Sequence, residues 1–177
     1  MFNNIRYRVY KYLLQKRMKN NSVERISKNF AQSKRIGILF DGSKLDNQVF
    51  VNEYRETLIK KKKKVDLLAF FDDKVVHNNV IYKYFNRKNL NYFWIPTGEV
   101  VQKFIETPFD ILISLHLQPA PHLEYISALS KAHMRVGLFR DDKQHCYDLM
   151  IDNPDNLDLK TFTKQIDYLL NIINSDG

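Results

Sequence analysis

The stretch that most constrains the fold runs from Ser33 to Lys44 and reads SKRIGILFDGSK. Its centre, residues 36–40, is a short apolar run with charge before it and Asp-Gly-Ser after it. Such a run is typical of a strand covered on both faces, and Asp-Gly-Ser is typical of a turn. A helix is predicted to begin near Asp46. The loop therefore joins a strand to a helix, and in an open α/β sheet such loops lie at the edge where ligands bind.

Strands and helices are predicted to alternate along the rest of the chain. Apolar runs predict strands, and apolar residues at three- and four-residue spacing predict helices. The predicted strands span 65–71, 90–95, 109–115, 135–139 and 147–151, and the predicted helices span 46–62, 75–86, 97–105, from 119 or 121 to about 132, and 157–174. Alternation implies right-handed crossovers and a mainly parallel sheet. We predict an α/β fold with an open sheet of five or six strands and helices on both faces, a Rossmann-like three-layer sandwich.

The net charge lies almost wholly in the first fifth of the chain. Residues 1–34 hold nine Lys and Arg against one acid, Glu24, whereas the remainder holds 19 basic and 19 acidic residues. The formal charge of +8 therefore points to an anionic partner for this segment, such as nucleic acid or a membrane surface. We expect a basic helical arm at residues 1–33 and an α/β domain at residues 34–177.

Residues 2–19 are predicted to form an amphipathic helix that ends at Asn20-Asn21-Ser22, with a second, shorter helical piece at 23–30. The first helix can lie on an anionic membrane, lie on RNA phosphates with tyrosines stacked on bases, or dock its apolar face on the domain. Its apolar boundary holds mostly Tyr and Arg rather than Trp, Phe and Leu, which favours RNA. The predicted phosphate contacts are Arg6, Arg8, Lys11, Lys16, Arg17 and Lys19.

A second basic cluster, five lysines at residues 60–64, follows the helix predicted at 46–62. Cations are favourable near a helix C-terminus, so a solvated last turn is the preferred interpretation. An extension of the basic surface is the alternative.

Composition excludes several classes of protein. No apolar run approaches the length needed to cross a bilayer, and the N-terminus lacks the apolar region and cleavage site of a signal peptide. The single cysteine, Cys146, excludes an intramolecular disulfide and a cysteine-based zinc site. We expect a cytoplasmic protein.

Polar residues at the predicted strand ends form a candidate ligand crevice, because the carboxyl ends of parallel strands meet at one edge. Carboxylates there can bind Mg²⁺ or act as acid and base, but aspartates also end strands and cap helices for local reasons, and this second interpretation is favoured. No D-x-D pair, P-loop or multi-glycine turn follows. We assign no catalytic residue, metal site or cofactor. The candidate crevice residues are Asp41, Ser43, Lys44, Asp72, Asp73 and His116.

Three stretches together resemble an uncharacterised family of small α/β proteins typical of Bacteroidetes. They are SKRIGILFDGSK, FDILISLHLQPAPHLEYISALSKAHMRVGLFRDD and the closing YDLMIDNP. The resemblance covers nearly the whole chain, implies a bacterial cytosolic protein and transfers no site. The strand pattern is also similar to half of a nucleotide-sugar glycosyltransferase, as an analogy of fold alone.

Three functional hypotheses follow. The first is a non-enzymatic accessory protein whose basic helix docks the domain onto RNA, such as ribosomal RNA. The second is a protein or enzyme that binds a small molecule, such as a nucleotide or phosphosugar, in the strand-end crevice. The third is a peripheral membrane protein anchored by the helix, and a protein partner is a further possibility.

Overall fold

The computed structural model describes residues 2–152 and 158–173 and confirms the α/β fold. Six strands form one sheet in the order β3-β2-β1-β4-β5-β6, and every neighbouring pair is parallel. The strands are β1 (Arg35–Asp41), β2 (Lys64–Phe71), β3 (Lys83–Asn86), β4 (Ile111–Leu115), β5 (Met134–Leu138) and β6 (Leu149–Ile151). The chain order reverses between β1 and β4, which is where ligands bind in open α/β sheets.

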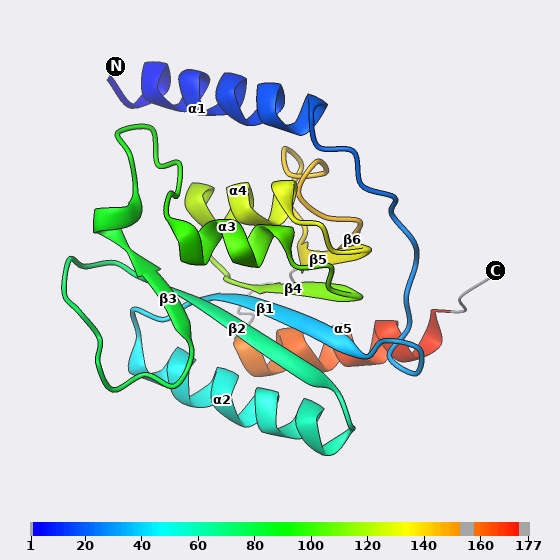
Figure 1. Cartoon of the computed structure of the whole chain (residues 1–177). Coiled ribbons are helices and arrows are strands. Elements are labelled where there is room, and N and C mark those ends of the chain that lie inside the picture. Colours follow the sequence, from blue (N-terminus) through cyan, green and yellow to red (C-terminus); the bar gives the residue numbers. More distant parts are fainter. Residues whose placement is uncertain (1, 153–157, 174–177) are drawn as a thin grey trace.

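Helices cover both faces of the sheet (Figure 1). The helices are α1 (Phe2–Lys19), α2 (Leu45–Lys60), α3 (Glu99–Glu106), α4 (Pro121–Leu129) and α5 (Leu159–Ile172), with a short 3-10 turn at Arg87–Asn89. α2 and α5 pack on one face, against Ile36, Ile38 and Phe40 of β1. α3 and α4 pack on the other face, together with Leu39. Alternating residues of β1 therefore enter opposite cores, as strand geometry requires.

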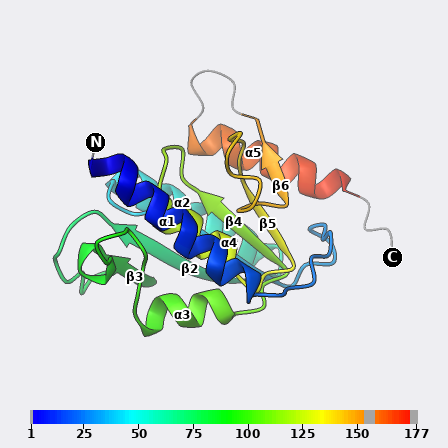
Figure 2. The same cartoon turned by 90° about the horizontal axis from the view of Figure 1, so that it is seen from above.

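α1 adds a further layer outside α4, as Figures 1 and 2 show. Every residue of α4 from Leu123 to Leu129 is buried, polar Glu124 and Ser127 included. A helix that is buried all round needs cover on its outer side as well as its inner side. α1 supplies that cover, with Tyr10 and Leu14 in the same core cluster as α4.

Residues 20–33 form an extended connection, not the short helix predicted at 23–30. Backbone N–H groups of this segment bond to carbonyls of the domain, from Ile26 to His133 and from Phe30 to Leu170. The Arg25 guanidinium donates to the carbonyls of Ser130 and Ala132. Because these bonds reach the α4–β5 connection and then α5, the segment links the two helical faces before β1 begins.

Two further predictions between β2 and α3 are wrong. Residues 75–86 are not a helix: they form a loop followed by β3, and Asp73 and Tyr84 accept hydrogen bonds from the loop N–H groups of Val75 and His77. Residues 90–95 are not a strand but a tight turn closed by an isolated Leu90–Pro96 bridge. The other predicted elements are confirmed with small shifts at their ends. Residues 157 and 174, the predicted ends of the last helix, lie outside the described residues.

Candidate functional site

The apolar face of α1 is committed to the domain. Tyr10 and Leu14 are buried, and Tyr7, Leu13 and Met18 pack partly against the same core. The Tyr10 hydroxyl donates to the carbonyl oxygen of Pro121, at the start of α4, over 2.7 Å. The helix is therefore docked by burial and by a specific hydrogen bond.

A buried charge cluster fastens α1 further. Lys143, in the loop after β5, lies 2.9 Å from the Glu124 carboxylate of α4 and donates to the Tyr7 hydroxyl, also over 2.9 Å. Both Lys143 and Glu124 are buried. Burial alone would lower the pKa of Lys143, but its bonds to Tyr7 and Glu124 raise that pKa above the ordinary value. The Tyr7 hydroxyl also donates to Asp142, so one side chain of α1 joins a buried ion pair of the domain.

The outward face of α1 is basic. Five of the six predicted phosphate contacts are exposed, namely Arg8, Lys11, Lys16, Arg17 and Lys19. Tyr12 lies among them with 63% of its surface exposed. α1 contains no acidic residue. Arg17 is directed differently, because its guanidinium carbon lies 5.8 Å from the centroid of the Tyr125 ring of α4. The stripe that Arg8, Lys11, Lys16 and Lys19 form around the one exposed ring we call the basic helix face.

Arg6 is only partly exposed and also lies off this face. Its guanidinium carbon lies 3.6 Å from the centroid of the Trp94 ring and 4.9 Å from that of Tyr92. Arg6 therefore turns toward the 91–94 turn instead of joining the basic helix face.

The five lysines at residues 60–64 do not extend the basic helix face. They run from the last residue of α2 to the first residue of β2, and α2 lies on the opposite side of the sheet from α1 (Figure 1). The Lys63 ammonium donates to the carbonyls of Phe30 and Ser33, and Lys61 lies 3.5 Å from the carboxylate of Asp167. Two of the five lysines thus hold local structure.

A crevice of about 490 Å³ lies at the carboxyl ends of β1 and β4. Five of the six predicted crevice residues line it: Asp41, Ser43, Lys44, Asp72 and His116. Asp73 does not. Within the described residues, the Lys44 ammonium has no ion pair, so it offers a free cation at this edge. We call this the switch-point crevice.

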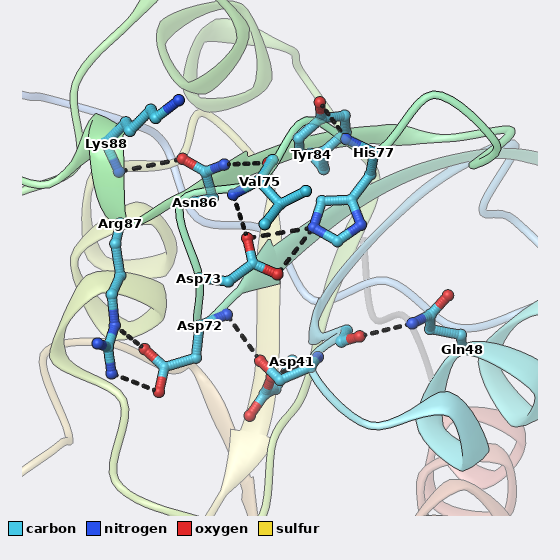
Figure 3. A network of polar contacts seen from close by, with 12 residues as sticks. Asp41, Gln48, Asp72, Asp73, Val75, His77, Tyr84, Asn86, Arg87 and Lys88 are labelled. Atoms are coloured by element: carbon cyan, nitrogen blue, oxygen red, sulfur yellow. Dashed lines mark hydrogen bonds and ion pairs between the residues drawn. The ribbon is translucent and has the colours of Figure 1, made fainter.

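The three predicted aspartates are each tied into local contacts (Figure 3). Asp41 accepts from the N–H of Ser43, and Asp72 forms a bidentate pair with Arg87 at 2.5 and 2.8 Å. Asp73 accepts from the N–H of Val75 and lies 2.9 Å from the ring Nε2 of His77. Carboxylates held in this way support loops and strand ends rather than a metal ion. In the described ranges, no group of His, Cys, Asp and Glu side chains could hold a metal ion.

Two histidines of the switch-point crevice are neutral. Burial lowers the pKa of His116. Its Nδ1 donates to the carbonyl of Gln118 over 3.0 Å, so its Nε2 accepts from the Tyr147 hydroxyl over 3.0 Å. Burial, with His116 nearby, lowers the pKa of His122 to about 4. The His122 ring lies 3.8 Å from that of Phe70, between centroids.

A second cavity, of about 600 Å³, adjoins the switch-point crevice and shares Phe70, Asp72 and His122 with it. We call it the Arg6–Trp94 cavity. Its remaining lining residues are Arg6, Lys74, Arg87, Leu90, Asn91, Trp94 and Pro121. Sequence reasoning missed this cavity, because it placed Trp94 in a strand and Arg6 on RNA. The one signal available was the single tryptophan of the chain close to a predicted strand end.

The buried position of Cys146 gives no indication of thiol chemistry. Cys146 is buried, and burial raises the pKa of its thiol to about 12, so the sulfur stays protonated. In the parts of the chain that the structure describes, no helix combines the length and apolar character needed to span a bilayer.

Comparison with known proteins yields a family and no activity. No curated protein matches this sequence, and no solved structure matches it. One family model matches residues 6–173 and thus includes most of α1 as well as the sheet. The chain therefore belongs to the family described as "Family of unknown function (DUF6913)".

Proposed function

We propose that this protein is a non-enzymatic accessory protein that docks onto RNA through the basic helix face of α1. The main support for this proposal is the way α1 is oriented. It buries Tyr10 and Leu14 on its own domain, while its exposed cations surround the exposed ring of Tyr12. Cations neutralise phosphates and release counterions, and an exposed aromatic ring can stack on an unpaired base. From Arg8 to Lys19 the face spans about 16 Å at the rise of an α-helix.

The way α1 docks favours RNA over a membrane. An interfacial helix binds lipid through its apolar face, but the apolar face of α1 already packs on α4. Among the α1 residues whose side chains the structure describes, Ile5 and Tyr12 are the large apolar side chains that are exposed. Membrane anchoring would therefore require α1 to leave its binding site on the domain.

The first test is RNA binding by the full chain, measured by fluorescence anisotropy with single-stranded and stem-loop RNA at several salt concentrations. We expect affinity to fall steeply with salt, with a slope of roughly −0.7 per phosphate contact on single strands. Replacing Arg8, Lys11 and Lys16 by glutamine should weaken binding and reduce the slope by about 2.

The matched control changes Lys60, Lys62 and Lys64 to glutamine, which removes the same charge from the opposite side of the molecule. This variant should bind RNA as the unmodified chain does. If the two triple variants lose RNA affinity equally, or if binding does not depend on salt, the basic helix face is not the RNA site.

Tyr12 gives an independent test of base stacking. Tyr12→Ala should cost about 1–3 kcal/mol of binding to single-stranded RNA, whereas Tyr12→Phe, which keeps the ring, should retain it. If both variants bind like the unmodified chain, the ring makes no contact with bases.

The proposal includes a bacterial, cytoplasmic setting, an origin in Bacteroidetes and ribosomal RNA as the partner. Its test is a pull-down from native lysate with the full chain, with and without nuclease. Ribosomal particles released by nuclease, and absent with the Arg8, Lys11 and Lys16 variant, support this partner.

A further inference from the structure

The Arg6–Trp94 cavity holds more positive than negative charge. Three cations, Arg6, Lys74 and Arg87, line it with one carboxylate, Asp72. Asp72 is already paired with Arg87 through two hydrogen bonds. Arg6 and Lys74 are therefore the two cations of the cavity that Asp72 does not neutralise. In the described part of the chain, neither has an ion pair. The cavity can therefore accept an anion without losing an internal salt bridge.

Among the described residues Arg6 has no polar partner, and the rings of Trp94 and Tyr92 hold it in place. Its guanidinium lies on the Trp94 ring at 3.6 Å, and its Nε is buried without a hydrogen bond. A half-buried charge lacking hydrogen bonds is unfavourable unless an opposite charge meets it. The edge of a guanidinium is well suited to the oxygen atoms of a phosphate.

Part of the cavity wall is aromatic and apolar. The rings of Trp94, Phe70 and His122 line it with Leu90 and Pro121. Trp94 has a positive φ of 58°, a conformation that residues other than glycine adopt only when the surroundings impose it. Asn91 imposes it here, because its carbonyl oxygen accepts from the N–H of Trp94 and its side chain accepts from Phe93 and Ile95. The backbone thus holds the only tryptophan of the chain against Arg6.

We propose that the Arg6–Trp94 cavity binds a small molecule that carries both a phosphate group and a planar ring, of the chemical class of nucleoside monophosphates. Arg6 and Lys74 bind the phosphate, and the rings of His122 and Phe70 contact the planar group. The volume of about 600 Å³ is within the usual range for small-molecule sites, about 300–1,000 Å³. The proposal is separate from RNA docking, because Arg6 lies against Trp94 and is absent from the basic helix face.

Trp94 makes the test direct, because it is the only tryptophan and lines the cavity. The fluorescence of the full chain is titrated with four nucleoside 5′-monophosphates, with the matching nucleosides, with ribose 5-phosphate and with inorganic phosphate. We expect at least one monophosphate to change the fluorescence in a saturable way. The nucleoside, the sugar phosphate and phosphate alone should each bind at least tenfold more weakly. Absence of a saturable response to every monophosphate, or equal binding of inorganic phosphate, would overturn the proposal.

Two lysines supply a matched pair that does not disturb α1. Lys74→Gln should weaken binding of the monophosphate about three- to tenfold. Lys88 is exposed and lies outside the cavity lining, so Lys88→Gln should leave that affinity unchanged. Arg6→Gln should weaken it at least tenfold, with thermal melting used to confirm that α1 stays docked. Equal effects of the two lysine variants would overturn the proposal even if Arg6→Gln does not fold.

Discussion

At the scale of single residues, the charge of His122 is set by its surroundings. Its ring lies on Phe70 between the two cavities, and burial lowers its pKa from 6.5 to about 4. The imidazole is therefore neutral at pH 7 and remains so well below the pH at which an exposed histidine gains a proton. A neutral ring can contact the planar part of a ligand without desolvating a charge.

This pKa predicts how stability depends on pH. Between pH 6.5 and pH 4 the unfolded chain binds a proton at His122 that the folded chain does not, so the free energy of unfolding falls as pH is lowered through this window. The loss between pH 7.5 and pH 5 should be about 2 kcal/mol from this residue. Urea unfolding at both pH values should show a smaller loss for His122→Gln, with His116 still contributing in the same direction. An unchanged pH dependence in the variant would contradict the assignment.

Gly137 provides a second prediction at this scale. A Cβ atom at Gly137 would lie 2.4 Å from the Tyr147 ring, and Tyr147 donates to His116. Gly137→Ala should therefore destabilise the protein by about 2–3 kcal/mol through overpacking. Gly42→Ala, where the nearest atom would be 3.2 Å away, should cost less. Thermal melting of the two variants compares the two losses of stability. A larger loss for Gly42→Ala than for Gly137→Ala would contradict the packing argument.

At the scale of elements, the docking of α1 depends on a buried ion pair. Lys143→Met should leave the Glu124 carboxylate buried, with Arg140, 3.9 Å away, as its remaining cation among the described residues. We expect the free energy of unfolding to fall by about 3 kcal/mol. This is at the low end for a broken buried ion pair, because Arg140 remains near the carboxylate. The double variant with Glu124→Gln should recover part of that loss, as measured by urea unfolding. No recovery would mean that packing of the lysine stem, and not charge, is what matters.

The elements also show how far the sequence could predict the fold. Strands such as residues 36–40 were predictable because they are short, apolar and buried on both faces. The apolar residues of 75–86 have helical spacing, but Val75, Val76 and Ile81 are exposed in a loop. Helical spacing of apolar residues predicts a helix correctly only if the segment buries those residues against the rest of the protein. At 90–95 the side chain of Asn91 accepts two backbone N–H groups and forms a turn where the apolar run suggested a strand.

The candidate site was predictable for the same reason as the sheet. Five of six crevice residues meet because parallel strands place their carboxyl ends together. The Arg6–Trp94 cavity was not predictable, because Arg6 and Arg8 are both basic residues of one helix. Only the position of α4 decides that Arg6 turns toward Trp94 while Arg8 faces outward. The spacing of apolar and basic residues along a helix does not determine which other elements its side chains contact.

At the scale of the whole molecule, α1 belongs to the same core as the sheet. Leu14 is buried beside α3 and α4 in the cluster that includes Leu39 and Leu112. Leu14→Ala should cost about 2–4 kcal/mol and leave a single cooperative transition. Ile5→Ala on the same helix, where Ile5 is 61% exposed, should change stability little. A separate early transition in urea would instead show that α1 unfolds independently of the sheet.

The bond from Tyr10 to Pro121 joins residues 111 positions apart, which has a consequence for the order in which the chain folds as it is synthesised. α1 is made before α4, so its binding surface does not exist until α4 has been translated. At about 5–20 residues per second, the apolar side of α1 stays uncovered for roughly 6–22 seconds. α1 is thus synthesised well before it can take its place on the domain. A nascent chain of this protein exposes a basic amphipathic segment to whatever binds it during that interval.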